Sequence, residues 1–203
     1  MATAVRVVGK PITHGTRTLR AQVAKNHENL TGKQALQVLN QSQKAATGKA
    51  KASTVSTTFG RVYNATGGPV TYVTAYDWEG HVAGKYPVNI QNGQWAVFEH
   101  VGTRGPHRQG SVATLVYNIK DCCEAMISWS NPWKTSHGGG NNTAYCEMND
   151  TGYFEECDWD EIRENLLASD TESETSMEGY ATKVSIEAGG NTPSYSATFY
   201  LDV

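Results

Sequence analysis

The sequence predicts a mainly β protein: an antiparallel β-sandwich with one helix packed across it, preceded by an N-terminal helical segment. Segments rich in β-branched and aromatic residues recur between residues 59 and 148, separated by clusters of Gly, Asn, Asp or Pro. That spacing is typical of antiparallel sandwiches rather than of βαβ units. Helical apolar patterns stand before and after this region. The chain has 203 residues, of which 38% are hydrophobic and 18% charged, so it can bury a substantial core.

The N-terminal part is polar and basic. Residues 16–30 and 31–46 each place apolar side chains at helical spacing, and Thr31 is positioned to cap the second of these helices. Residues 47–58 are mostly small and polar and are expected to form a linker. The chain is therefore expected to divide into a basic helical arm with its linker, residues 1–58, and a sandwich, residues 59–203.

The sandwich begins with an alternating segment over residues 59–66, followed by the turn signal Gly67-Gly68-Pro69. The run from Gly138 to Asn142 is expected to be a loop. Further strands are expected over the β-rich segments 69–78, 88–91, 93–101, 111–119 and 125–133.

An acidic helix is expected over residues 157–168. The apolar face of this helix is expected to comprise Trp159, Ile162, Leu166 and Leu167, and the carboxylates near its start favour the positive end of the helix dipole. Residues 170–179 are predicted to form a polar loop. Two final strands are expected over residues 180–189 and 194–203.

The charges are distributed unevenly along the chain. Residues 1–60 carry nine Lys and Arg against one acidic residue, a balance of +8, whereas residues 61–203 carry eight against nineteen, a balance of −11. A basic arm on an acidic body indicates self-docking or attraction to an anionic surface, and two solvated faces are the simpler alternative.

Several functional classes are not expected. The sequence has no G-x-S-x-G, H-E-x-x-H or P-loop motif, so an enzyme is not expected, and no cofactor is implied. The four cysteines form no C-x-x-C pair and are expected to be free thiols, and no metal site is predicted. Nucleic acid is not an expected partner, because the basic arm has no aromatic residue for base stacking before Phe59.

The start of the chain bears on localisation. It lacks the apolar stretch of a secretory signal, so we expect synthesis in the cytosol and unconventional release for any role outside the cell.

The placement of tryptophans is the most informative functional feature. Trp95 and Trp129 lie in apolar strands and are expected in the core. Trp78 and Trp133 lie at strand ends or in loops, where indole rings suit a membrane–water boundary or the binding of a quaternary ammonium group. For these two, burial in the core is an equally open alternative.

The segments VYNATGGPVTYVTAYDWEGHV, GQWAVFEH and ISWSNPW resemble the small jasmonate-induced proteins of plants and the related nakanori-like proteins of fungi. The resemblance covers residues 60–203 in detail and the N-terminal helices more loosely. That group is similar to the actinoporins, single-domain β-sandwiches that recognise sphingomyelin. The resemblance implies an actinoporin-like sandwich that binds sphingomyelin, together with cholesterol, at a membrane surface.

The resemblance also implies site residues. Gly110, Ser111 and Val112 match the strand start of the actinoporin site, and the segment Ser130-Asn131-Pro132-Trp133 matches its Ser-x-Pro-aromatic loop. Trp159 stands at the first tyrosine position of the helix behind that loop, but the next two positions fall on Arg163 and Glu164, so the phosphocholine pocket does not carry over intact. The implied lipid-binding residues are Trp78, Gly110, Ser111, Val112, Ser130, Pro132, Trp133, Tyr145, Tyr153, Trp159 and Glu164.

The expected mechanism is adhesion to membranes as a peripheral protein. Aromatic rings at one end of the sandwich face the choline group, and Ser130 with backbone amides donates to the phosphate. Binding without pore formation is expected, because about 60 residues precede the sandwich and their apolar stripe is narrow. Two alternatives stay open: a carbohydrate-binding lectin of defence type, and a pore-forming cytolysin. The sequence does not predict the oligomeric state.

Overall fold

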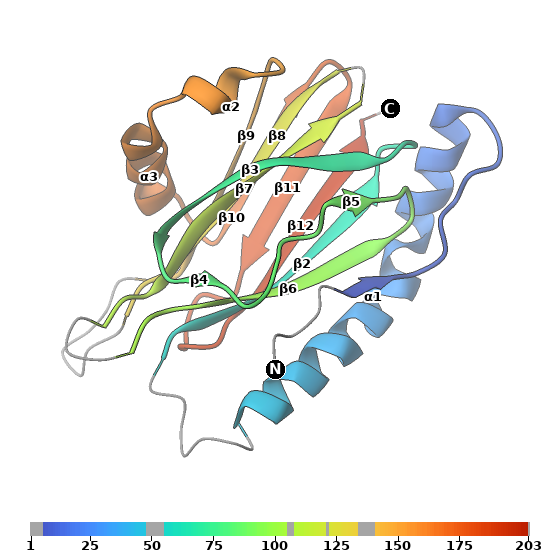
Figure 1. The fold of residues 1–203 in the computed structure, drawn as a ribbon. Helices are drawn as coiled ribbons and strands as arrows, with labels where there is room; N and C mark the ends of the chain where they lie inside the picture. The colour runs from blue at the N-terminus through green and yellow to red at the C-terminus, as the bar shows by residue number, and fades with distance from the viewer. Residues whose placement is uncertain (1–5, 48–54, 105–107, 121, 134–140, 203) are drawn as a thin grey trace.

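The computed structural model describes residues 6–47, 55–104, 108–120, 122–133 and 141–202. Two β-sheets pack face to face, with helix α1 on the outer side of one sheet and helices α2 and α3 on the outer side of the other (Figure 1). No helix in this part of the chain combines the length and the apolar character that a membrane span requires.

The first sheet has the strand order β1-β6-β2-β12-β11-β10, with β4 paired to β6, and the second has the order β5-β3-β7-β8-β9. The strands of the first sheet are β1 (Arg6–Val8), β2 (Thr57–Ala65), β4 (His81–Val82), β6 (Trp95–Val101), β10 (Glu172–Met177), β11 (Tyr180–Ile186) and β12 (Ser194–Leu201). Those of the second are β3 (Val70–Glu79), β5 (Asn89–Ile90), β7 (Ser111–Ile119), β8 (Cys123–Asn131) and β9 (Thr143–Asn149). The predicted sandwich is confirmed. One pairing among the described strands departs from it, because β2 and β12 run parallel.

The main core lies between the sheets and follows from the alternation of side chains along each strand. Leu115 and Trp129 face the opposite sheet, whereas Val116 and Met126 face the helices on the outer side. Because both of its faces are covered, every residue of β8 is buried. Trp95 and Trp129 are 2% and 0% exposed, as expected for core residues.

The N-terminal segment differs from its prediction. It contains one continuous helix, α1 (Arg17–Thr47), instead of two, and it begins with strand β1, which pairs with β6. Thr31 does not cap a helix; its hydroxyl donates to the carbonyl oxygen of His27 one turn earlier (3.0 Å). Helix capping by Thr requires free backbone amides, and here those amides are already used inside the helix.

Helix α1 packs on the first sheet through small side chains. Its buried residues are Ala21, Ala24, Gly32, Ala35 and Leu39. Their small size brings the helix close enough for the Tyr63 hydroxyl to donate to the carbonyl oxygen of Ala24 (2.7 Å) and for the indole N–H of Trp95 to donate to Thr31 (3.1 Å).

Two predicted irregular segments contain strand residues. The predicted linker includes Thr57 and Thr58, which begin β2; residues 48–54 lie outside the described part. The predicted polar loop 170–179 contains β10, whose residues alternate between exposed and half-buried. A two-residue turn, Glu178-Gly179, joins β10 to β11 with positive φ angles of 51° and 79°, the geometry typical of a tight hairpin. The pairing partner, rather than the polar composition, decides the structure of this segment.

Helices α2 (Tyr153–Glu156) and α3 (Trp159–Ala168) cover the second sheet. The predicted helix 157–168 therefore starts two residues late, because the Asp158 carboxylate caps α3 by accepting from the backbone N–H groups of Asp160 (2.9 Å) and Glu161 (3.4 Å). The predicted glycine loop 138–140 lies outside the described residues.

Candidate functional site

The site begins at an irregularity at the end of β3. The pairing of β3 with β7 shifts register between Asp77 and Glu79, so that an extra residue, Trp78, is accommodated there. Asp77 is anchored from the inside: its Oδ1 accepts from the Tyr86 hydroxyl (3.0 Å) and lies 3.3 Å from Nε2 of His100. Trp78 instead packs in the cluster beneath α2 and α3. Trp78 thus shares the outer face of the second sheet with Tyr76, as strand alternation requires, and the bulge brings Glu79 to the same face.

Aromatic rings gather around Trp78. Trp159, the first residue of α3, stacks on Tyr76 with ring centroids 5.3 Å apart and meets Trp78 edge to face at 6.5 Å. Tyr76 is 42% exposed, and both tryptophans are half-buried. The two predicted residues Trp78 and Trp159 thus lie together in a cluster that is open to solvent on one side.

Glu79 joins this cluster to the beginning of β7. Its Oε2 accepts from the backbone N–H of Gly110 (2.8 Å), and its Oε1 accepts from Nη2 of Arg163 in α3 (3.0 Å). The Gly110 backbone in turn lies against the predicted Pro132-Trp133 loop: a Cβ on Gly110 would stand 2.8 Å from Cα of Pro132 and 2.9 Å from the backbone N of Trp133. Only glycine fits this close approach.

The loop itself is half-buried. Trp133 is partly exposed, and the guanidinium of Arg108 lies 4.9 Å from the centroid of its indole ring. A cation is attracted to the face of an indole ring, so Arg108 occupies one face of the Trp133 ring.

A row of side chains crosses the sheet beneath α3. Glu79, Val112, Ser130 and Thr143 are successive cross-strand partners, and the Thr143 hydroxyl donates to the carbonyl oxygen of Leu166 in α3 (2.8 Å). Val112 and Ser130 are each 1% exposed.

Three buried polar atoms of this region have no hydrogen-bond partner among the residues that the structure describes. They are Nε1 of Trp78, Nε of Arg163 and Oγ of Ser130. An unpaired buried donor is costly, by about 1–3 kcal/mol for each group, so a cluster of such donors is a candidate site for an oxygen-rich ligand.

Ser111 points away from this face. It is 0% exposed, and its hydroxyl lies in the core, 2.7 Å from Oγ1 of Thr58 and 2.9 Å from Nδ1 of His100, while accepting from the indole N–H of Trp129 (3.2 Å). The expectation that Ser111 and Val112 both line a lipid site is therefore not met by the geometry, because consecutive residues of a strand face opposite sides.

Burial sets the protonation of this inner network. It lowers the pKa of His100, an effect that the neighbouring Asp77 opposes without overcoming it, so the imidazole is neutral at pH 7. Burial alone raises the pKa of Asp77, but contacts with His100 and Tyr86 outweigh it and leave the pKa lowered.

The remaining predicted residues lie around the edge of the cluster. Tyr145 is half-buried on the outer face, its hydroxyl donates to Glu147 (3.2 Å), and burial with that carboxylate raises its pKa to about 12. Tyr153 is 47% exposed on α2, and Glu164 is exposed on α3. Sequence reasoning missed Tyr76 and Glu79; the alternation of β3 could have indicated Tyr76, but nothing local marks Glu79 as a partner of α3.

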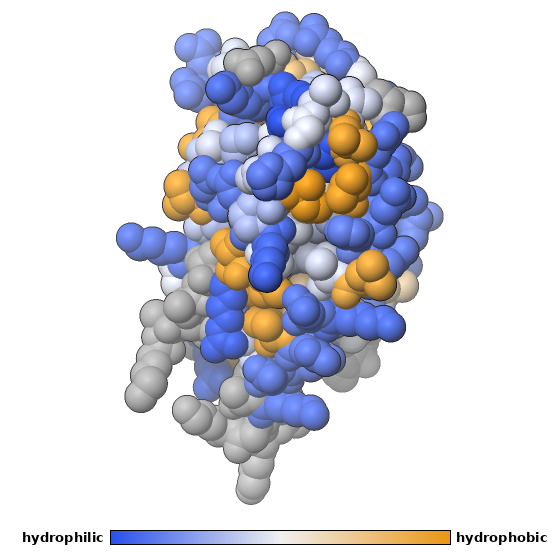
Figure 2. Space-filling model, turned by 90° about the vertical axis from the view of Figure 1, so that its right-hand side faces the viewer, coloured by the Kyte–Doolittle hydropathy of each residue, from blue (hydrophilic) through white to orange (hydrophobic). Residues whose placement is uncertain are grey.

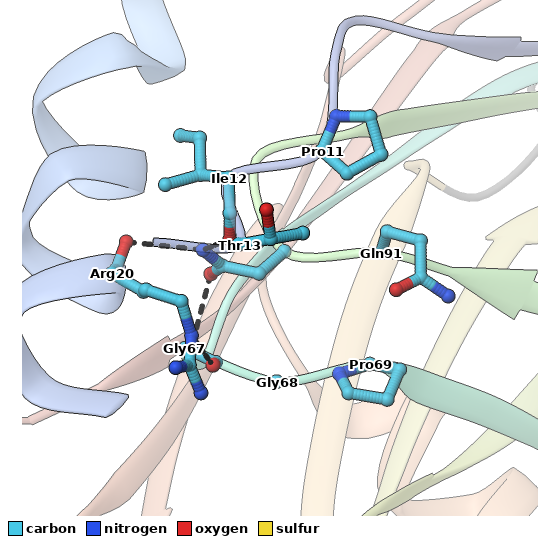
Figure 3. Close-up of a pocket in the computed structure, with 9 residues that line it drawn as sticks. Pro11, Ile12, Thr13, Arg20, Gly67, Gly68, Pro69 and Gln91 are labelled. Carbon is cyan, nitrogen blue, oxygen red and sulfur yellow. Dashed lines mark hydrogen bonds between the residues drawn. The ribbon is translucent and has the colours of Figure 1, made fainter. Parts of the chain in front are cut away.

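A separate cavity of about 170 Å³ lies where the N-terminal segment, α1 and the β2–β3 turn meet (Figure 3). Its polar groups are largely engaged. Arg20 Nε donates to the carbonyl oxygen of Gly67 (2.8 Å), and the Asn92 amide donates to the carbonyl oxygens of Ile12 (3.2 Å) and Arg20 (3.0 Å). These bonds hold the N-terminal segment and α1 to the sandwich, so this cavity is a structural contact region. Among the described residues no cluster of three or more His, Cys, Asp or Glu side chains could hold a metal ion.

The two sheets, the long helix on one of them and the short helices over an aromatic cluster on the other define a helix-flanked β-sandwich protein. The chain belongs to the Nakanori-like protein family, whose model matches residues 3–201. The resemblance found in the sequence is thereby confirmed.

Three known proteins are similar to this chain. The crystal structure of the lipid binding protein Nakanori superposes with a TM-score of 0.84 at 24% identity, covering 96% of this chain and 100% of that chain, which shows the fold. The 23 kDa jasmonate-induced protein of Hordeum vulgare is 35% identical over 136 residues, 63% of this chain, and the match spans only 62% of that relative's length. A lectin of Xerocomus chrysenteron is more distant, with a TM-score of 0.47 at 14% identity over 71% of this chain and 99% of that chain.

Proposed function

We propose that this protein binds lipid headgroups at membrane surfaces, with sphingomyelin in cholesterol-containing membranes as its target, and that it does so without forming pores. Membership of the Nakanori-like family and the fold shared with a lipid binding protein support this proposal. The site proposed for the headgroup is the outer face around Trp78, Trp159, Arg163 and the Trp133 loop.

The observation that carries the proposal is the set of unpaired donors. Within the described part of the chain, Trp78 Nε1, Arg163 Nε and Ser130 Oγ are buried without hydrogen-bond partners, next to indole rings that are partly exposed. A phosphodiester oxygen accepts hydrogen bonds from guanidinium, indole and hydroxyl groups, and bonds from a charged guanidinium are the strongest of these. We assign the phosphate of the headgroup to these donors.

The cationic end of the headgroup has two kinds of partner available. The exposed aromatic rings of the cluster, with Tyr76 the most accessible, attract a quaternary ammonium through their faces. The Glu79 carboxylate lies beside them and adds a negative charge, although Arg163 already offsets part of it. A headgroup that carries both a phosphate and an ammonium matches this pairing of charges.

Surface charge supports a zwitterionic target. Asp160, Glu161 and Glu164 are all exposed on α3, and their carboxylates repel an anionic membrane. Leu167, 53% exposed on the same helix, and the Trp133 ring supply apolar groups for the headgroup layer.

Binding without pore formation is supported by the position of α1. The helix is covered on one side by the first sheet, and β1, which precedes it, pairs with β6, so the segment before the helix is held in the sheet. We further propose peripheral recruitment to membranes, with unconventional release if the target membrane lies outside the cell, and a role in defence on the likeness to the jasmonate-induced barley protein.

Vesicle binding tests the proposal. Co-sedimentation with sphingomyelin–cholesterol vesicles is expected to exceed that with phosphatidylcholine–cholesterol vesicles, and an encapsulated dye is expected to stay inside. Trp78→Phe keeps an aromatic ring but removes the N–H donor together with part of the indole ring, so it is expected to weaken binding by at least about tenfold, the loss of one hydrogen bond to a charged group. Trp133→Ala is expected to weaken binding more.

Val88→Ala is the matched control. Val88 is an exposed hydrophobic residue (67%) that directly precedes β5 and lies outside the site. Equal binding by wild type and Trp133→Ala, or competition by free sugars without any dependence on sphingomyelin, would overturn the proposal.

A further inference from the structure

The Glu79 carboxylate lies in direct contact with Arg163, the cation assigned to the headgroup phosphate. Its Oε1 lies 3.0 Å from Nη2 of Arg163 in α3, and its Oε2 accepts from the backbone N–H of Gly110 (2.8 Å). The side chain is 25% exposed, and both of its oxygens are engaged. These contacts hold a negative charge in a defined position beside the phosphate donors, so Glu79 acts on every ligand that enters the site.

The charges of the site nearly cancel. Arg163 is the single cation among residues 147–178, which contain twelve carboxylates. Glu79 offsets the formal charge of Arg163, while Nε of Arg163 stays buried without a hydrogen-bond partner among the described residues. A second cation of the region, Arg108, is engaged by the ring of Trp133. The site therefore offers hydrogen-bond donors to a phosphate but little net attraction to negative charge.

Phosphate headgroups differ in charge according to their ester class. A phosphodiester is singly charged, whereas a phosphomonoester carries about −1.5 to −2 at pH 7. When a phosphodiester also carries a quaternary ammonium, the headgroup is neutral overall, and its cationic end is attracted to Glu79. A phosphomonoester brings a larger negative charge and no compensating cation, so Glu79 repels it at contact distance.

We propose that Glu79 sets the headgroup selectivity of this site, so that the protein accepts the zwitterionic phosphodiester of sphingomyelin and rejects phosphomonoesters such as ceramide 1-phosphate. The inference rests on the proposed lipid function and adds to it the class of phosphate and the residue that selects it. Arg163 and Trp78 donate to phosphate oxygens of either class and supply affinity. Glu79 is a positioning residue, which acts through its charge and through Arg163.

The range of its action distinguishes Glu79 from the other carboxylates nearby. Asp160, Glu161 and Glu164 are exposed on α3. At about 0.5 M salt the Debye length is about 4 Å, so the effect of these exposed charges on a membrane is largely screened. Glu79 contacts Arg163 at 3.0 Å and is only partly exposed, so its effect on a phosphate bound there persists. Selectivity that remains at high salt is therefore assigned to Glu79.

Vesicle binding at about 0.5 M salt tests the proposal. Phosphatidylcholine–cholesterol vesicles carry either sphingomyelin or ceramide 1-phosphate, two lipids that share a ceramide body and differ in the headgroup. Co-sedimentation gives Kd for each, and the wild type is expected to bind the sphingomyelin vesicles at least about tenfold more tightly. Glu79→Gln removes the charge at nearly constant size, so it is expected to reduce this preference by about tenfold, chiefly through tighter binding of ceramide 1-phosphate.

Two further variants separate charge from structure. Glu79→Asp keeps the carboxylate and is expected to keep the preference, even where the shorter side chain weakens both Kd values. Gln37→Lys is the control for net charge, because it shifts the net charge by one unit in the same direction as Glu79→Gln. Gln37 is exposed on α1, the helix on the opposite side of the sandwich from α3. Figure 2 views that side, where most of the surface is hydrophilic.

Gln37→Lys is expected to leave the ratio of the two Kd values unchanged, and thermal melting checks that each variant is folded. A wild type that binds neither kind of vesicle refutes the lipid function itself. A wild type that prefers sphingomyelin, with a preference that Glu79→Gln leaves unchanged or that Glu79→Asp also removes, overturns this inference alone. Equally tight binding of ceramide 1-phosphate by the wild type also overturns it, and that result needs no variant to fold.

Discussion

Arg163→Gln separates a binding role of the guanidinium from a structural one. Its ion pair with Glu79 joins atoms 3.0 Å apart, but the two side chains are 38% and 25% exposed, so water screens the pair. Such a pair contributes at most about 1 kcal/mol to stability. For a domain of this size that corresponds to a fall in Tm of about 2–4 °C.

The expected effect on lipid binding is larger. A hydrogen bond from a charged donor to a phosphate oxygen contributes about 1.5–3 kcal/mol. Loss of this bond raises Kd by a factor of about 10 to 150. Surface plasmon resonance on captured sphingomyelin–cholesterol vesicles measures that change, and calorimetry measures Tm on the same preparation.

Lys183→Gln is the control for this experiment. Lys183 lies on β11 with its Nζ 3.9 Å from Oε2 of Glu174, so the substitution removes an exposed ion pair of the same type. It is expected to leave both Kd and Tm nearly unchanged. Unchanged vesicle binding by Arg163→Gln would refute the assignment of the phosphate to Arg163. A fall in Tm far beyond the expected range would make Arg163 a structural residue instead.

Three further predictions concern the backbone beside the site, the buried network beneath it and a turn outside it. Gly110→Ala places a methyl group 2.6–2.9 Å from the backbone that leads to Trp133, so it is expected to lower stability by about 1–3 kcal/mol and to weaken vesicle binding; an unchanged Tm would contradict the packing described. In urea titrations the wild type is expected to lose stability as the pH falls below about 6.5. The pKa of His100 is lowered in the folded protein, so the unfolded chain binds the proton first. The lowered pKa of Asp77 adds a further loss of stability only near pH 4 and below. His100→Asn is expected to flatten this dependence, and an equal slope in both proteins would contradict it. Gly67→Ala forces a side chain into a backbone with φ +78° against the first turn of α1, so Tm is expected to fall while vesicle binding at low temperature persists; loss of binding by the folded variant would place the turn in the site.

The parts of the fold that the sequence predicts are those with a local signal. The burial of Trp95 and Trp129 follows from their apolar strands, and α3 follows from its apolar stripe and early carboxylates. Strand β10 has polar residues throughout and becomes a strand because β11 pairs with it, which only the turn at Glu178-Gly179 indicates.

The candidate site was predictable only in part, because most of it depends on contacts between distant segments. Trp78 meets Trp159 of a distant helix, and Glu79 reaches the same face through a bulge in the pairing of β3 with β7, where it contacts a residue 84 positions further along the chain. Ser111 is different: the alternation of its own strand shows that it cannot share a face with Val112. The motif that implied both residues spans two consecutive strand positions, whose side chains face opposite sides of the sheet.

The parallel pairing of β2 with β12 has a consequence for biosynthesis. Strand β12 lies between β2 and β11 in the first sheet, and among the described strands of this sheet it is synthesised last. Until then β2 lacks one of its two neighbours, and the apolar residues Val62 and Phe59 lack part of their cover. Folding of this sheet therefore cannot be completed before β12 has emerged, and a nascent chain truncated before residue 194 would present an unpaired strand edge to the cell's chaperones.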